Sequence, residues 1–525
     1  MDTEDWAGGE ALLMKARARL SVRWTRDDGP SSVMEKTIAS SVVRAALLEA
    51  NNALGVIWTN RSEPERALPF LEDARAAYEE APAGTRTTRE EAGHTQTLFY
   101  LAQVLGQLGR EDESAAMCGG CLRRQLERRG GVGWTSPEEW AQNAAQLAGF
   151  YVSKAHWATA RHCVAAAERV YDDAYPRWAR KHIRGEAAAA ADGGGDASAL
   201  PDEVADVGAN VQLAWGKLHL HRLMAARDLF ASRGTSETGI AAAAKRAAAA
   251  GDDHRLDIAF PSLRLAGEGG KAAEAVGLVS QGPNEGWIPR DVCTARVVFN
   301  AAAPRYRAAL SHYLLDGFVT EHCDALLDVS SLHKALAFFE ASHSRRRHHA
   351  LQRRRVLRID AALAQLSPRT FPGLCKTLWF EVGEAHRAVL ESKIEAGRPP
   401  LRLASAARAA AEGYERFLRA YDDDENTGQP PERVPEDEER AYLTARFVLA
   451  RVVSKTHGAG SEAEALARAL VEYEAFASYV KRHAVTGFDA EAGLCAEMAE
   501  LLPTKIDNLR RLEARDASAV DPLTA

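Results

Sequence analysis

The 525-residue sequence carries 66 lysines and arginines against 73 aspartates and glutamates, which gives a formal charge of −7. This balance argues against nucleic acid and anionic membranes as partners, because both attract strongly basic proteins. The chain starts with acidic residues and contains no window of about 18 uncharged apolar residues, so we expect neither a secretory signal nor a membrane span. Seven cysteines, an odd number, favour free thiols in a reducing cytoplasm.

Ala, Leu, Arg and Glu dominate the composition, and runs of β-branched residues are scarce, which predicts an almost entirely helical chain. Segments 2–24 and 34–50 read as a helical pair that leads into an array of repeats. Three units follow at 51–78, 97–127 and 143–171, each with the packing pattern of a tetratricopeptide hairpin. A Leu-small pair packs the first helix of such a hairpin, and small or apolar residues about 12, 16 and 19 positions later pack the second. The matching residues are Leu54, Gly55, Trp58, Ala67, Leu71 and Ala74; Leu101, Ala102, Leu105, Ser114, Cys118 and Cys121; and Leu147, Ala148, Tyr151, Ala160, Val164 and Ala167.

The spacing of these units predicts an irregular array. Gly55, Ala102 and Ala148 are equivalent positions, so the steps are 102 − 55 = 47 and 148 − 102 = 46 residues. A plain tetratricopeptide array repeats every 34 residues or about that. Longer helices or loops still stack into a solenoid, and the concave surface of a solenoid usually binds a partner protein.

The rest of the chain also favours helices, interrupted by loops. Segment 185–208 is acidic and of low complexity, which predicts a mobile loop, and helical segments return at 209–232 and 238–250. A long helical run from Arg290 to Leu327 follows a Gly-rich junction at 266–286. We therefore expect an N-terminal subdomain at 1–288, a linking helix region at 289–328 and a C-terminal helical subdomain at 329–525. Within the last, 330–366 is one long helix or a kinked pair, and 422–439 is an acidic, Pro-containing flexible loop.

Cys118 and Cys121 form the motif that most suggests a chemical function. A CxxC pair could be a redox pair or half of a zinc site, but a redox pair usually follows a strand and zinc needs a second pair. Both cysteines stand at packing positions of the second repeat, so burial is the favoured interpretation. His219 and His221 face different sides of a helix, and no catalytic or phosphate-binding motif is present. We expect no enzyme activity, no catalytic residues, no cofactor and no metal.

A dense basic run extends from Arg345 to Arg358. It could be a solvated helix face that pairs with acidic loops, a contact for an acidic protein surface or a contact for phosphate. No aromatic residue is interleaved with the arginines, so base stacking is not indicated.

The predicted groove of the repeats is neutral. A carboxylate clamp would need Lys or Arg on the first helices, and none stands at the corresponding positions. The positions carry mostly amide side chains instead. These could form hydrogen bonds to a helix of a partner protein, or they could simply be an ordinary hydrated surface. These residues are Asn52, Asn60, Tyr100, Gln103, Gln107, Gln142 and Gln146.

The chain resembles the KIF-binding protein (kinesin-binding protein) family. The resemblance lies in NNALGVIW, LFYLAQV, LRRQLE, NAAQLAGFY with ARHCVAAA, DGFVTEH, HKALAFFE and LLPTKI, in the same order as in the animal proteins. It implies an all-α, tetratricopeptide-like right-handed α-solenoid of antiparallel helix pairs, with two subdomains joined by a linking helix. It also implies a non-enzymatic, cytoplasmic and cytoskeleton-associated protein, which we expect to be a monomer. Such a protein binds kinesin motor domains, sequesters their microtubule-binding face and so regulates microtubule-based transport. The alternative is a general adaptor that scaffolds another complex through the same groove.

The resemblance also implies which residues bind the motor. Tyr100, Gln103 and Gln125 match family residues on the binding face, whereas Gln146 stands where the animal members carry Thr. Gln142 and Asn52 join them from the groove pattern. Near the linker, contacts are expected at His322, Asp328 and His333. The sequence departs from the animal pattern in its shorter N-terminus, its central loops and its more basic HSRRRHHALQRRR segment.

Overall fold

The computed structural model contains two compact helical units. It describes residues 3–25, 33–82, 84–131, 134–176, 178, 182, 200–231, 257–263, 288–422, 431–457 and 461–520. The first unit comprises 1–222, 248–287 and 304–312, and the second comprises 223–247, 288–303 and 313–525. Every regular element of the described residues is a helix, which confirms the all-α class. None of the described helices combines the length and the apolar character that crossing a bilayer requires.

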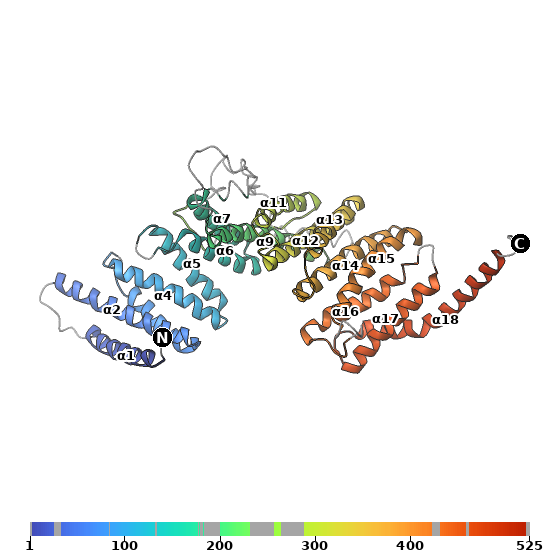
Figure 1. The fold of residues 1–525 in the computed structure, drawn as a ribbon. Helices are drawn as coiled ribbons and strands as arrows, with labels where there is room; N and C mark the ends of the chain where they lie inside the picture. The colour runs from blue at the N-terminus through green and yellow to red at the C-terminus, as the bar shows by residue number, and fades with distance from the viewer. Residues whose placement is uncertain are drawn as a thin grey trace. The chain divides into compact units, whose positions relative to one another are not determined.

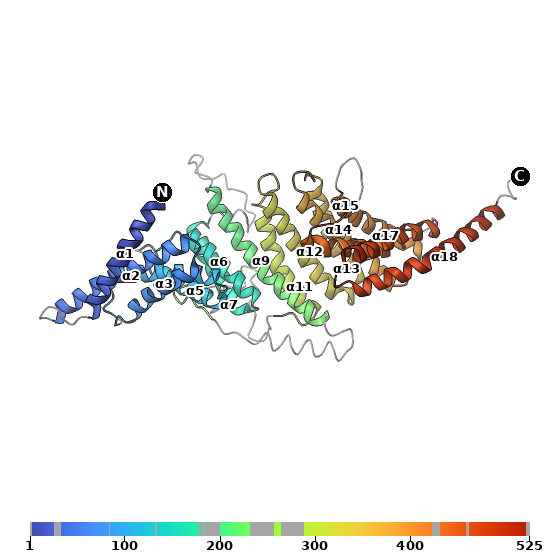
Figure 2. The ribbon, with the colours of Figure 1, turned by 90° about the horizontal axis from the view of Figure 1, so that it is seen from below.

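The first unit stacks antiparallel helix pairs in chain order, and up to residue 174 each helix packs against the next (Figure 1). Figure 2 shows the same helices from a perpendicular direction. Its helices are α1 (Thr3–Thr25), α2 (Val33–Asn60), α3 (Pro64–Glu79), α4 (Thr88–Gln107), α5 (Glu111–Glu127), α6 (Pro137–Ser153), α7 (Trp157–Ala174) and most of α9 (Asp202–Ala231).

The repeat register predicted from the sequence is confirmed in these helices. Leu54, Leu71 and Ala160 are fully buried. A Cβ atom added at Gly55 would lie 2.5 Å from Leu71 Cδ2, so a small residue is needed where α2 crosses α3. In the second repeat, Ser114 Oγ donates a hydrogen bond of 2.6 Å to the carbonyl of Ala102, which joins α5 to α4. The predicted helix start at Ser136 is confirmed as well, because its hydroxyl caps α6.

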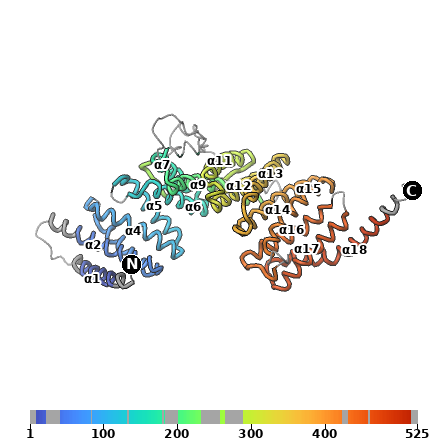
Figure 3. The backbone as a smooth tube through the Cα atoms, viewed as in Figure 1, coloured from blue at the N-terminus to red at the C-terminus, as the bar shows by residue number. Residues whose placement is uncertain are grey.

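The second unit is likewise built from adjacent antiparallel helices that pack against one another, as the tube in Figure 3 traces. Its helices are α12 (Val319–Ala341), α13 (Arg345–Leu363), α14 (Pro372–Glu395), α15 (Pro400–Arg419), α16 (Glu436–Val453), α17 (Glu462–His483) and α18 (Asp489–Val520), together with the first part of α11 (Val292–Leu310). The break between α12 and α13 shows that 330–366 is a helical pair and not one long helix.

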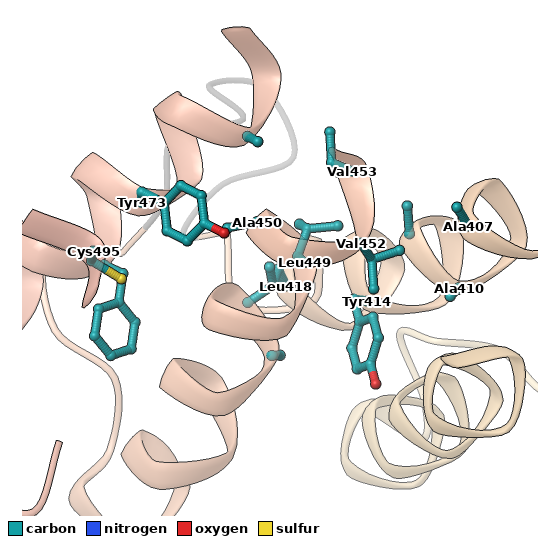
Figure 4. Close-up of a cluster of buried hydrophobic side chains, with 14 of the residues drawn as sticks. Ala407, Ala410, Tyr414, Leu418, Leu449, Ala450, Val452, Val453, Tyr473 and Cys495 are labelled. Carbon is teal, nitrogen blue, oxygen red and sulfur yellow. The ribbon is translucent and has the colours of Figure 1, made fainter. Parts of the chain in front are cut away.

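A large apolar cluster holds α15 to α18 together. In Figure 4, Tyr414 of α15, Leu449 of α16, Tyr473 of α17 and Cys495 of α18 contribute to one continuous core. Next to it, α14 and α15 approach so closely that a Cβ atom added at Gly413 would lie 2.7 Å from the backbone nitrogen of Gly383. Burial of large side chains by neighbouring helices is the main stabilising term in such a stack.

Three expectations about the organisation need correction or lie outside the described residues. The run from Arg290 to Leu327 is two helices, because α11 ends at Leu310 and a turn at 311–318 precedes α12. The predicted loops are shorter at their C-terminal ends, since α9 begins at Asp202 and α16 at Glu436. The predicted helix 238–250 lies outside the described residues, and the subdomain boundaries at 288 and 328 stay predictions.

Candidate partner-binding surface

Helix α4 presents the clearest exposed face among the predicted groove residues, and local sequence explains where it starts. A capping box sets its N-terminus: the Thr87 hydroxyl accepts a hydrogen bond from Glu90 N, and the Glu90 carboxylate accepts one of 2.7 Å from Thr87 N. The buried Glu90 carboxylate also pairs with Arg44 of α2. The start and the rotation of α4 are therefore tied to its neighbour.

Asn52 of α2 makes the second polar contact between α2 and α4. Its amide nitrogen donates to the carbonyl of Gly93 at 2.9 Å, and its amide oxygen accepts from Thr97 Oγ1 at 2.8 Å. The side chain is 2% exposed. The expectation that Asn52 lies on an open groove face is therefore wrong, because its hydrogen bonds are satisfied inside the α2–α4 contact.

The opposite side of α4 is open to solvent. Four of its exposed residues, Gln96, Phe99, Gln103 and Gln107, recur at three- and four-residue intervals and so share one helix face, which we call the α4 stripe. Arg89 is exposed on the same face nearer the start of α4, where it pairs with Glu49 of α2. The stripe carries no charge.

Tyr100 borders the α4 stripe. It is half-buried against a core of Leu71, Leu101 and Val104, and the Phe99 ring meets its edge with centroids 5.3 Å apart. The pair forms an aromatic anchor on the rim of the amides.

Helix α6 adds one exposed amide of the same kind. Gln146 is exposed, whereas Gln142 is half-buried and its oxygen accepts a hydrogen bond of 3.3 Å from Asn210 of α9. Asn60, at the end of α2, is exposed as well. The first helices of the repeats thus offer Gln103 and Gln146 fully to a partner and Gln142 only in part.

Gln125 does not lie on this surface. It is 7% exposed near the C-terminus of α5, and within the described residues its side-chain oxygen has no hydrogen-bond partner. Direct contact of Gln125 with a partner would need this side chain to leave the interior, so its expected exposure is wrong.

The three predicted residues of the second unit differ in exposure. His322 is half-buried, with Nδ1 2.7 Å from the carbonyl of Tyr313, and Asp328 is also half-buried. His333 is 5% exposed, its Nδ1 lies 2.7 Å from the carbonyl of Val329, and the Phe299 ring meets it edge-on. Burial lowers the pKa of His333 to about 4, so the ring is neutral at pH 7 and its Nδ1–H donates to Val329. His333 therefore supports the helix from within, contrary to the expected contact.

The candidate residues are divided between the two units. Tyr100, Gln103 and Gln146 belong to the first unit, and His322 and Asp328 belong to the second. The α4 stripe with its aromatic rim is the part that the structure brings together.

Of the two CxxC thiols, Cys121 lies in the interior, as its packing position predicts, whereas Cys118 is half-buried. Cys121 is buried and its Sγ–H points to the carbonyl of Thr95 at 3.6 Å. Burial raises the pKa of Cys118 to about 11 and that of Cys121 to about 12, so both are protonated thiols at neutral pH. All seven cysteines are free, and Cys293 is exposed. No group of three metal-ligating side chains gathers among the residues that the structure describes.

Sequence reasoning missed two aromatic features of the same helices. Phe99 is 37% exposed beside Tyr100, and the Trp58 ring lies between the guanidinium groups of Arg61 and Arg66, each 4.8 Å from its centroid. The signal for Phe99 was present, because it stands four residues before Gln103 on the same helix face. The Trp58 stack had only the weaker signal of two arginines within eight residues.

The family model described as KIF-1 binding protein C terminal matches residues 138–509, well over half of the chain. The chain belongs to the KIF-binding protein family. Relatives of that name match almost its full length. The KIF-binding protein of Gallus gallus is 26% identical over 554 residues, which cover 97% of this chain and 85% of that protein. The Xenopus tropicalis KIF-binding protein is 27% identical over 559 residues, covering 97% and 83%, and the Drosophila melanogaster one is 23% identical over 509 residues, covering 88% and 78%.

Proposed function

We propose that this chain binds kinesin motor domains through the first-helix face of its N-terminal repeats. The printed names of its relatives, KIF-binding proteins, support the class of partner. The coverage of 97% of this chain means that the likeness includes the repeats as well as the C-terminal region. Those relatives are named for binding and not for a reaction, which fits a protein without catalytic side chains at the proposed surface.

The observation that carries the proposal is the α4 stripe with its aromatic rim. Phe99 and Tyr100 supply apolar area that a partner can cover, and Gln103 supplies donor and acceptor groups at its edge. Binding surfaces commonly combine a few aromatic anchors with a polar rim. Because the stripe is uncharged and the helix below it is tied to α2, recognition depends on shape and hydrogen bonds from a preformed surface.

The mechanism that follows is steric occlusion. A motor that holds its microtubule-binding face against this surface cannot present that face to tubulin, so the two partners compete without any chemical step. The chain would then act in the cytoplasm as a monomeric regulator of microtubule-based transport and would reach the cytoskeleton through its motors.

The test compares two amide truncations. Gln103→Ala with Gln146→Ala removes two exposed amides of the proposed surface, and Gln365→Ala removes an exposed amide of the second unit as a matched control. We expect the double variant to weaken binding of a motor domain about tenfold or more, equivalent to about 1.4 kcal/mol, by fluorescence anisotropy. Equal affinity for the double variant and the control would reject the surface.

Microtubule co-sedimentation then separates occlusion from the adaptor alternative. With the wild-type chain in excess, occlusion removes the motor from the microtubule pellet. If the chain pellets together with the motor, the protein is an adaptor and the occlusion mechanism is wrong.

A further inference from the structure

Helix α13 of the second unit carries a second exposed face of different chemistry. Arg346, Arg353, Arg354 and Leu357 are exposed, and their seven-, eight- and eleven-residue offsets place them on one side of the helix. We call this set the basic stripe. Arg346 and Arg354 are separated by about 12 Å along the helix axis, and Leu357 is 57% exposed next to them.

The arginines of the basic stripe are not used to hold the fold. Within the part of the chain that the structure describes, Arg346, Arg353 and Arg354 take part in no ion pair, whereas their neighbour Arg347 lies 3.8 Å from Glu340. A fourth arginine, Arg355, is buried and belongs to the interior. The three guanidinium groups are therefore available to an external anion.

One arginine of the basic stripe, Arg346, stands in the first turn of α13, where a positive charge works against helix stability. Helix α13 has no acidic residue in its first turn, and the Ser344 side chain makes no capping hydrogen bond. The N-terminus of a helix is the positive end of its dipole, so arginine there is unfavourable by a few tenths of a kcal/mol, roughly, per charge. The same arrangement concentrates positive potential, which favours a negatively charged ligand.

Buried contacts fix the helix below the basic stripe. Arg355 pairs with Glu381 of α14, and its Nε donates to Ser330 Oγ of α12 at 2.8 Å. Two turns earlier along the chain, the buried His348 has Nδ1 2.9 Å from the carbonyl of Ala337. Figure 1 shows α13 beside α12 and α14, which it contacts. The exposed arginines thus project from a helix whose rotation is set, and little ordering of the backbone is left for a partner to impose.

We propose that the basic stripe binds an acidic peptide segment of a partner protein. The planar guanidinium fork matches a carboxylate with two parallel hydrogen bonds. Carboxylates at alternate residues of an extended chain are about 6.6 Å apart, so two or three of them span the stripe. Leu357 accommodates an apolar side chain between the acidic ones. No aromatic residue of α13 is available to stack a nucleotide base, which favours a peptide over a nucleic acid. The basic stripe and the α4 stripe have no residue in common, so the inference does not depend on motor binding.

The experiment uses the full chain and a fluorescein-labelled, glutamate-rich peptide of roughly twelve residues with one central leucine, a length that exceeds the stripe. The variant Arg346→Gln, Arg353→Gln, Arg354→Gln removes three charges. The control Arg440→Gln, Arg482→Gln, Arg510→Gln removes three exposed charges from other helices of the same unit. We expect the first variant to weaken peptide binding about tenfold or more at about 50 mM salt and the control to leave it within about twofold.

Three further measurements decide between kinds of partner. Wild-type affinity should fall about tenfold between about 50 and 200 mM salt, as charge recognition requires. Replacing the three arginines by lysine, with the charge kept, should restore only part of the affinity because the fork is lost. Substituting the peptide leucine by serine should weaken binding through Leu357.

Two results would overturn the proposal. One is equal peptide affinity of the triple variant and the control. The other is tighter, stripe-dependent binding to phosphatidylserine vesicles or to single-stranded oligothymidine than to the peptide, which would assign the stripe to a membrane or to a nucleic acid.

Discussion

The α4 stripe of the first unit and the basic stripe of the second unit share a construction and differ in chemistry. Each is an exposed face of one helix. In each case a buried polar side chain, Asn52 for α4 and Arg355 for α13, fixes the orientation of the helix about its own axis. The first face is neutral and the second is cationic. The comparison teaches that the interior contact and the exposed chemistry of a stacked helix are separable. One face can then recognise shape while the other recognises charge.

The largest expected effect is the loss of stability of the second unit when the buried ion pair between Arg355 and Glu381 is broken. Arg355→Ala removes a 1%-exposed side chain and leaves Glu381 without its cationic partner, although Ser330 Oγ still donates a hydrogen bond to it. Breaking a buried ion pair in this way destabilises a protein by about 3–5 kcal/mol. We expect a loss of that size for the transition of the second unit, measured by urea unfolding followed by circular dichroism.

Arg353→Ala is the matched control for this change, because it lies on the same helix and is exposed. We expect it to alter the free energy of unfolding by less than about 0.5 kcal/mol. If both variants unfolded at the same urea concentration, Arg355 would not be the tie that sets α13.

A smaller loss of stability is expected when the pH is lowered from 7 to 5. Burial lowers the pKa of His333 to about 4, below the value of about 6.5 for an unfolded chain. The unfolded state therefore binds the proton first. The stability associated with neutral His333 is present above pH 6.5 and is lost as the pH falls from there toward 4. Between pH 7 and pH 5 the loss is about 2 kcal/mol.

His333→Gln should remove that part of the pH dependence, measured as the shift in the urea midpoint between pH 7 and pH 5. His343→Gln is the control, since His343 is exposed. An unchanged pH dependence in His333→Gln would mean that the imidazole is not buried as described.

The smallest expected effect is the loss of stability of the first unit when the hydrogen bonds of Asn52 are removed. Asn52→Ala removes the hydrogen bonds to Gly93 and Thr97 and leaves those polar groups with fewer partners. The expected cost is about 1–2 kcal/mol, because the groups are neutral and Thr97 Oγ1 keeps its bond to the carbonyl of Gly93. Asn60→Ala, at the exposed end of α2, should change the thermal midpoint little. A larger loss for Asn60→Ala than for Asn52→Ala would reverse the assignment of the two amides.

Much of the fold could be predicted because small residues mark the places where helices cross. Gly55 and Leu71 stand at the predicted spacing and meet in the structure. The turn at 311–318 could not be predicted in this way, because its apolar residues continue the helical pattern of α11. The starts of α9 and α16 were hidden for another reason. Acidic residues in the first turn, such as Asp202 and Glu436, favour a helix start. Here they follow other acidic residues in segments whose composition predicts a loop, so the helix starts could not be distinguished from the loops.

The candidate surface was predictable only where residue type and exposure agree. Gln103 and Gln146 are polar and lie at the surface. Asn52 and His333 are polar and lie inside, where backbone carbonyls accept their hydrogen bonds. The partner carbonyl of Asn52 comes from a helix 41 residues away, so no local pattern could have revealed it.

The unequal environment of the thiols has a practical consequence. Cys293 is exposed on α11, while burial raises the pKa values of Cys118, Cys121, Cys323 and Cys495. A maleimide reacts with thiolate, so a short treatment near neutral pH should attach one dye at Cys293 before any other position. The natural sequence thus accepts a fluorescent reporter without mutagenesis, on a helix that bears neither recognition face.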